Sequence, residues 1–222
     1  MKPTPLLFAG IFASFAAAWL GLIVASDVQI GNLQPQVDEE NADIYPINVA
    51  GIAEQGRRVY VSNGCNYCHT QFVRDASAGA DISREWGNRR TVARDYIYEG
   101  GATVGFMRNG PDLANIGAPK EETSKRKYVD DAKWQYAHLY NPRSTVPGSN
   151  MPAYRFLFET RKISGQRSDD ALNLTEADGI EAGYEVVPSN DAKALVAYLR
   201  SLDKSHPLSE VKGAAPSPAA AK

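Results

Sequence analysis

The chain has 222 residues, enough for one ordinary domain together with additional segments. Its 24 Lys and Arg residues nearly balance its 26 Asp and Glu residues, which gives a formal net charge of −2 at pH 7. This balance is not that of a nucleic-acid-binding protein, so we expect no nucleic acid among its partners.

The N-terminal part of the chain is apolar. Residues Pro3 to Ser26 carry no charge, and apolar residues dominate the run from Leu6 to Ser26. A helix needs roughly 20 such residues to cross the hydrocarbon core of a membrane. The alternative is a cleaved secretory signal, whose apolar region has only about 7–15 residues. The sequence therefore predicts a cytoplasmic N-terminus at residues 1–4 and an uncleaved transmembrane anchor at residues 5–26.

Charged residues on the two sides of this run indicate its orientation. Lys2 precedes the run, and acidic residues follow it, namely Asp27, Asp38, Glu39, Glu40 and Asp43. By the positive-inside rule, the N-terminus lies in the cytoplasm and the main domain lies outside it. We therefore expect a single-pass protein of a bacterial inner membrane, embedded in the lipid bilayer, with a periplasmic domain.

Residues 27–49 read as a polar linker, and a domain is expected over residues 50–206. Apolar side chains recur at helical spacing near both ends of this domain. The first set is Ile52, Gly56, Val59 and Tyr60, and the second is Leu195, Tyr198, Leu199 and Leu202. Ser189 or Asn190 can cap the second helix. Residues 158–183 form a polar excursion, and residues 207–222 are predicted to be a disordered tail.

The only two cysteines stand in the motif Cys65-Asn66-Tyr67-Cys68-His69. On a helical turn, two thiols at this spacing match the two vinyl groups of a haem, and His69 is then placed to ligate the iron as the proximal ligand. The alternatives are a redox dithiol, half of a zinc site and a structural disulfide. A zinc site needs further ligands, and no second cysteine pair exists. The motif favours one covalently attached haem c.

Gly110-Pro111-Asp112-Leu113 resembles the Gly-Pro-x-Leu element of class I cytochromes c. The resemblance implies that the Pro111 carbonyl accepts a hydrogen bond from His69, which fixes the imidazole ring. It also implies that the first and last helices cross, with Gly56 at the close approach and Tyr60 and Tyr198 filling the contact. We therefore predict a mainly α fold, a transmembrane helix followed by a class I cytochrome c domain with a large insertion at residues 72–109.

The distal iron ligand has several candidates. Met151 precedes Pro152, and Met-Pro is the distal-ligand pattern of class I cytochromes c; a thioether raises the reduction potential relative to a second histidine. His138 and His206 are the bis-histidine alternatives. Met107 lies just before the Gly-Pro element, on the proximal side. We predict that His69 and Met151 ligate the iron, and that His138 remains an alternative.

Two arginines are candidates for contact with a haem propionate, because the guanidinium group fits a carboxylate. Arg143 follows Pro142, and Arg155 follows the predicted distal loop. A solvated surface arginine is an equally good interpretation of each. Arg143 is included in the predicted cofactor-binding set, and a role for Arg155 stays open.

Several segments together resemble subunit II of cbb3-type cytochrome c oxidases. They lie in the family's order and are residues 64–74, 110–113, 138–143, 149–154 and 183–188, preceded by the N-terminal anchor. The likeness reaches to about Lys204. It departs from the family pattern between Arg74 and Gly110, so partner contacts made there are uncertain.

This resemblance implies an electron-transfer subunit of a proton-translocating oxidase. The haem would take electrons from a further cytochrome c subunit or a soluble donor cytochrome. It would pass them to b-type haems of a multi-span haem–copper catalytic subunit that reduces oxygen. The chain itself would carry electrons and hold no catalytic site. The alternative is a free-standing membrane-anchored electron shuttle, which would share every haem residue.

Overall fold

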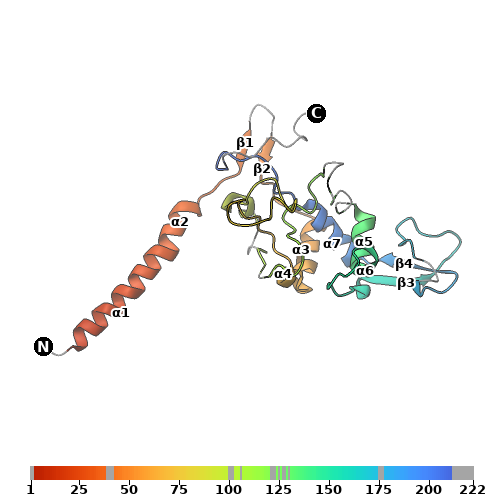
Figure 1. Ribbon diagram of the computed structural model, residues 1–222, viewed down its shortest axis with the longest axis horizontal. Helices are drawn as coiled ribbons and strands as arrows, with labels where there is room; N and C mark the ends of the chain where they lie inside the picture. The colour runs from red at the N-terminus through yellow and green to blue at the C-terminus, as the bar shows by residue number, and fades with distance from the viewer. Residues whose placement is uncertain are drawn as a thin grey trace. The chain divides into compact units, whose positions relative to one another are not determined.

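A computed structural model of the chain describes residues 3–38, 43–99, 103–105, 107–120, 124, 126, 129, 131–174 and 178–211. The chain divides into two compact units. The first comprises Met1–Ile47 with Ala93–Tyr98, and the second comprises Asn48–Val92 with Glu99–Lys222. Figure 1 labels the helices and strands of both units.

The first unit contains the apolar helix that the composition predicts. Helix α1 (Thr4–Trp19) continues through a π-helical turn (Leu20–Val24) into α2 (Ala25–Ile30). The resulting 27-residue helix is long and apolar enough to cross a membrane. It extends one turn past the predicted end at residue 26, so Asp27 lies within it. Lys2, on which the predicted orientation depends, lies outside the described residues.

The segment predicted as a linker contains a short β-hairpin. Strands β1 (Gln36–Asp38) and β2 (Asp43–Tyr45) are antiparallel, with Val37 opposite Ile44. A 3₁₀ turn at Ala93–Tyr96 belongs to the same unit. The Tyr45 hydroxyl donates a hydrogen bond of 2.7 Å to the Asp95 carboxylate, which ties this turn to the hairpin.

The second unit is mainly helical. Its helices are α3 (Ile52–Ser62), α4 (Cys65–Cys68), α5 (Ala132–Tyr140), α6 (Pro142–Thr145) and α7 (Asn190–Ser201), with a 3₁₀ turn at Arg155–Leu157. Strands β3 (Phe158–Lys162) and β4 (Tyr184–Pro188) form an antiparallel pair, with Thr160 opposite Val186. The polar excursion predicted at residues 158–183 therefore begins with one strand of this pair and ends just before the other.

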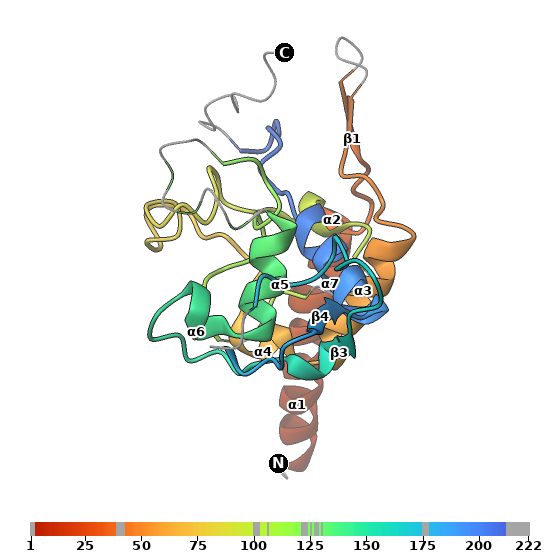
Figure 2. The ribbon, with the colours of Figure 1, turned by 90° about the vertical axis from the view of Figure 1, so that its right-hand side faces the viewer.

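Helices α3 and α7 pack side by side and form the centre of the core (Figure 2). A Cβ atom at Gly56 would overlap the Ala194 carbonyl oxygen and would lie 2.7 Å from Tyr198 Cβ. The rings of Tyr60 and Tyr198 have centroids 5.4 Å apart at an interplanar angle of 59°. The predicted contact of the first and last domain helices is thus present, with glycine and tyrosines at the expected positions.

The start of α7 and the segment that follows it add two details to the sequence prediction. Ser189, rather than Asn190, caps α7, because its side chain accepts a hydrogen bond from the Ala192 backbone nitrogen. Leu208 is buried and the His206 carbonyl accepts a hydrogen bond from Arg89, so packing continues past residue 206 into the segment predicted as tail. Residues 212–222 and parts of the 72–109 segment (100–102 and 106) lie outside the described residues.

Removing the close approach of α3 and α7 should destabilise the protein. Gly56→Ala places a methyl group against the backbone of α7, and overpacking of this kind costs about 1–3 kcal/mol of unfolding free energy. Urea titration of the purified full chain, followed by far-ultraviolet circular dichroism, measures the loss. Val61→Ala on the exposed face of α3 is the control and should stay within about 0.5 kcal/mol. Equal stability of wild type and Gly56→Ala would contradict the observed packing.

The apolar helix should hold the protein in a membrane. We expect the protein to remain in the membrane pellet after an alkaline carbonate wash and to dissolve only in detergent, because the whole apolar face of Thr4–Ile30 is exposed. Mass spectrometry of the purified chain should recover the segment from Leu6 to Ser26. A mature chain that begins at Ser26 or later, without a lipid, would identify the segment as a signal peptide.

Candidate functional site

The two cysteines lie on one helical turn. Gly64 adopts a left-handed conformation (φ 69°) that starts α4, and the His69 backbone nitrogen closes the turn on the Cys65 carbonyl at 3.0 Å. Side chains three residues apart lie on the same face of a helix, so both thiols face one side. Both cysteines are free, Cys65 packed against the core and Cys68 exposed. Burial raises the pKa of the Cys65 thiol to about 11.

The His69 ring is held in one tautomer. Its Nδ1 lies 2.8 Å from the Pro111 carbonyl oxygen. Because a carbonyl can only accept, Nδ1 carries the proton and Nε2 keeps its lone pair. Burial lowers the pKa of His69, which also favours the neutral ring. The contact implied by the Gly-Pro-x-Leu resemblance is therefore present, and it leaves one nitrogen able to ligate a metal.

Two glycines make room for this histidine. The His69 ring lies directly against Gly110, where a Cβ atom would overlap Cε1 and would lie 2.6 Å from Nδ1. Gly105 has a φ of +80°, and a Cβ atom there would overlap the His69 carbonyl oxygen. Any side chain at Gly110 would displace the ring, and at Gly105 it would also meet an unfavourable backbone conformation.

Backbone hydrogen bonds join the segment after α4 to the loop that contains Pro111. Gly110 donates to the Cys68 carbonyl at 3.0 Å, and Leu113 donates to the Thr70 carbonyl at 2.8 Å. Gln71 donates to the Val104 carbonyl at 2.9 Å. The ring and its acceptor therefore belong to two segments that cannot move independently of each other.

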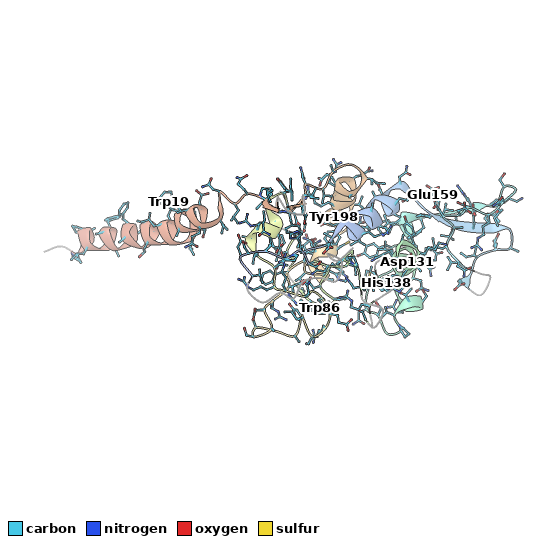
Figure 3. The ribbon with its side chains drawn as sticks, turned by 90° about the horizontal axis from the view of Figure 1, so that it is seen from above. Trp19, Trp86, Asp131, His138, Glu159 and Tyr198 are labelled. Atoms are coloured by element: carbon cyan, nitrogen blue, oxygen red, sulfur yellow. The ribbon has the colours of Figure 1, made fainter. Side chains whose placement is uncertain are left out.

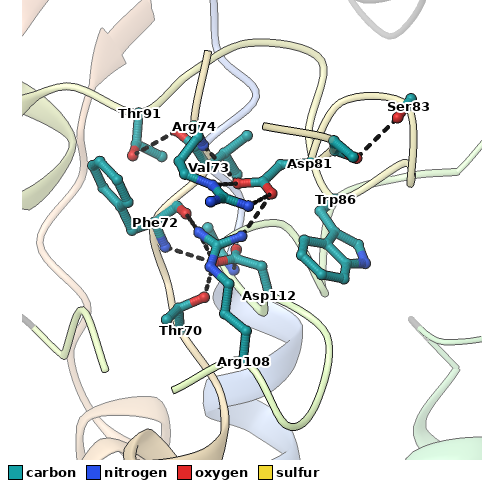
Figure 4. Close-up of polar contacts among 12 residues, drawn as sticks. Thr70, Phe72, Val73, Arg74, Asp81, Ser83, Trp86, Thr91, Arg108 and Asp112 are labelled. Atoms are coloured by element: carbon teal, nitrogen blue, oxygen red, sulfur yellow. Dashed lines mark hydrogen bonds and ion pairs between the residues drawn. The ribbon is translucent and has the colours of Figure 1, made fainter. Parts of the chain in front are cut away.

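Two aspartates and two arginines lie beside these two segments (Figure 4), and the sequence pattern gave no role to any of them. Asp112 is buried and accepts hydrogen bonds from the Thr70 hydroxyl at 2.6 Å and from the Phe72 backbone nitrogen at 2.7 Å. Asp81, also buried, pairs with Arg74 at 2.9 Å and with Arg108 at 2.7 Å. These two arginines hold the pKa of Asp81 well below its usual range, against the opposing effect of burial.

The methionine candidates differ in their surroundings. Met151 is half-buried and packs against the main core, and its backbone nitrogen donates to the Ser149 hydroxyl at 3.2 Å. Met107 is 55% exposed, with the Asn109 amide 3.9 Å from its sulfur. Burial of a thioether next to the core is the setting expected for an iron ligand inside a domain, and Met151 has it.

His138 is a half-buried residue of α5 (Figure 3). Its ring stacks on Trp134, with centroids 4.7 Å apart at 9°. Its Nδ1 lies 2.6 Å from the Thr145 hydroxyl, which itself donates to the Pro142 carbonyl. Burial lowers the pKa of His138 to about 4, with a smaller contribution from His69. His138 is thus a neutral ring in the electrostatic environment of His69.

The remaining candidates lie at the surface or near it. Arg143 is exposed in the first turn of α6. Arg155 is exposed too, and its guanidinium group lies 5.2 Å from the centroid of the Tyr140 ring. His206 is half-exposed, with Nδ1 2.7 Å from the Pro207 carbonyl oxygen. Arg155 thereby contacts Tyr140, a residue of the main core.

The donor set near α4 comprises two thiols on one face of a turn and one imidazole nitrogen with a fixed lone pair. These groups could hold a haem, with the thiols at its vinyl groups and His69 Nε2 at its iron. The half-buried thioether of Met151 offers a second ligand of suitable type. Among the residues that the structure describes, no cluster of three or more His, Cys, Asp and Glu side chains could hold a metal ion.

Comparison with known proteins agrees with this donor set. A search of the curated proteins finds no match to the chain. A family model described as "Cytochrome C oxidase, mono-heme subunit/FixO" matches residues 17–185, which include the cysteine motif, Pro111 and Met151. This match covers most of the chain and begins inside the apolar helix. The chain therefore belongs to the mono-heme FixO family of cytochrome c oxidase subunits, the subunit II family of cbb3-type oxidases.

Proposed function

We propose that the chain is the electron-transfer subunit of a cbb3-type oxidase and carries one haem c attached at Cys65 and Cys68. The observation that carries this proposal is the fixed His69 tautomer, with Nδ1 bonded to Pro111 and Nε2 left as a ligand, beside two free thiols on one turn. When bound, haem supplies one-electron redox chemistry. The chain supplies its attachment, its axial ligands and its surroundings.

Attachment uses the two thiols directly. Each sulfur forms a bond to one carbon of a vinyl group, and the thiol hydrogen goes to the other carbon, so nothing leaves. The protonated Cys65 thiol is compatible with this addition. His69 then ligates one face of the iron, and the Pro111 carbonyl increases the basicity of its ring.

Met151 completes the axial set in this proposal, and Arg143 pairs with a propionate. A thioether favours ferrous iron more than a second imidazole does, which suits a carrier that delivers electrons to an oxidase. The core packing of Met151 and the surface position of Met107 support this choice. In this proposal His138 does not ligate the iron and remains a neutral ring stacked on Trp134.

The match to an oxidase subunit family supports the path of electrons that we propose. The chain takes electrons from a further cytochrome c subunit or a soluble donor cytochrome. It delivers them to a multi-span catalytic subunit, where oxygen is reduced. The helix Thr4–Ile30 anchors the haem domain at the periplasmic face of the inner membrane, with the N-terminus in the cytoplasm. The apolar helix and the family match support this arrangement.

Covalent attachment is tested by removing the thiols. We expect Cys65→Ala/Cys68→Ala to lose all haem staining on denaturing gels, because no sulfur remains to form a thioether bond. Each single variant should show reduced staining and a shifted pyridine haemochrome band, because one vinyl group stays unsaturated. Ser62→Ala, a change just before the motif, is the control and should stain as the wild type does. Staining of the double variant would refute the proposed attachment.

The distal ligand is tested at the two methionines. Ferric haem with a thioether ligand has a weak sulfur-to-iron absorption band at the red end of the visible spectrum. We expect Met151→Leu to abolish this band, and Met107→Leu to retain it, because Met151 packs against the core whereas Met107 is 55% exposed. Met151→His should lower the reduction potential, since imidazole favours ferric iron. Loss of the band in Met107→Leu alone would reverse the assignment without affecting haem attachment.

A further inference from the structure

We propose that Asp112 is a positioning residue for His69 and that its buried carboxylate keeps the reduction potential of the haem low. This inference rests on the proposed function, because it concerns the haem that His69 would ligate. Asp112 hydrogen-bonds to residues just after His69 rather than to the imidazole ring itself.

Asp112 connects the two segments that determine where the His69 ring lies. Its Oδ2 accepts hydrogen bonds from the Thr70 hydroxyl at 2.6 Å and from the Phe72 nitrogen at 2.7 Å. Its Oδ1 accepts from the Ala114 nitrogen at 2.8 Å. Thr70 directly follows His69, and Asp112 directly follows the ring's acceptor, Pro111. One carboxylate therefore sets the distance between the histidine backbone and the carbonyl to which its ring is bonded.

These hydrogen bonds lie in the interior, where other hydrogen-bond partners are scarce. Asp112 is 1% exposed and Thr70 is 6% exposed, so water cannot replace a lost partner. The Phe72 and Ala114 nitrogens can only donate, which is the arrangement that a charged carboxylate needs. Loss of the carboxylate would leave buried donors unsatisfied and would leave only backbone hydrogen bonds between the two segments, so the ring would settle in a different orientation.

The charge of Asp112 is less compensated than that of its neighbour Asp81 (Figure 4). Arg74 and Arg108 approach Asp81 to 2.9 and 2.7 Å, whereas Arg108 lies 3.9 Å from Asp112. Asp112 directly follows Pro111, whose carbonyl oxygen lies 2.8 Å from His69 Nδ1, so a negative charge on Asp112 lies close enough to favour positive charge on the ring. A field that favours positive charge on the imidazole also favours ferric over ferrous iron.

The test replaces each aspartate by its neutral isostere in the full-length, haem-loaded protein in detergent. Asp112→Asn should raise the ferrous-to-ferric ratio at a fixed ambient potential on the order of tenfold, which is 59 mV for one electron. It should also change the g values of the ferric protein in electron paramagnetic resonance, because the imidazole plane turns. Asp81→Asn is the matched control, with the same charge change and a shared partner in Arg108. It should keep the g values and shift the ratio much less.

A second pair of variants decides the question if Asp112→Asn does not fold. Thr70→Val removes the hydroxyl donor and should change the g values, whereas Thr70→Ser keeps the donor and should restore them. Wild-type potential and g values in Asp112→Asn, or an equal shift in Asp81→Asn, would overturn the inference. So would identical g values in the two Thr70 variants. Covalent haem staining of the wild type separates the outcomes, because its absence refutes the proposed function, whereas stained protein without these shifts refutes only the role of Asp112.

Discussion

The candidate site depends on the contact between the His69 ring and the Gly110-Pro111 backbone. The ring can donate to Pro111 at 2.8 Å only because Gly110 has no side chain in the space that the ring occupies. Tautomer, orientation and the free Nε2 all follow from this one close approach. The backbone bonds from Gly110 to Cys68 and from Leu113 to Thr70 then hold the approach in place. A ring held in this way would need little reorganisation if a metal that it ligated changed charge.

The crossing of α3 and α7 gives this contact a rigid base. Gln71 is fully buried two residues after His69, and its amide donates to the Tyr198 hydroxyl at 3.0 Å. Tyr198 packs against Tyr60, and its Cβ lies beside Gly56. The Thr103 hydroxyl donates a hydrogen bond of 3.1 Å to the side-chain oxygen of Gln71. The next residue, Val104, accepts the hydrogen bond from the Gln71 backbone nitrogen. The packing of the first and last domain helices is thereby connected, through polar contacts, to the segment that follows the cysteine motif.

Sequence reasoning reached the features whose determinants are local. The helical spacing around Gly56 and Tyr198 predicted the two helices, and the resemblance to class I cytochromes c implied that they pack together and that Pro111 is the partner of His69. It did not reach the pairing of β3 with β4, because Phe158 and Pro188 are far apart and the residues between them show no strand alternation. Likewise, no periodicity marks Asp81 and Arg108 as partners, because loop segments bring them together. Asp112 stood inside a recognised motif, but its role depends on Thr70 and Phe72, which only folding brings to it.

The segment predicted as an insertion has a structural purpose of its own. Within the segment, Thr91 donates to the Val73 carbonyl at 3.0 Å, and the Asn115 amide of the following loop donates to the Trp86 carbonyl at 3.0 Å, so the segment packs against the loop that contains Pro111. Asp81 then neutralises Arg108, whose second nitrogen bonds the Phe72 carbonyl. These contacts bury backbone groups of the segment and of the loop that contains Pro111 away from water. Covering them lowers the local dielectric around His69, and in such surroundings one incompletely compensated carboxylate has the greatest effect on a nearby redox centre.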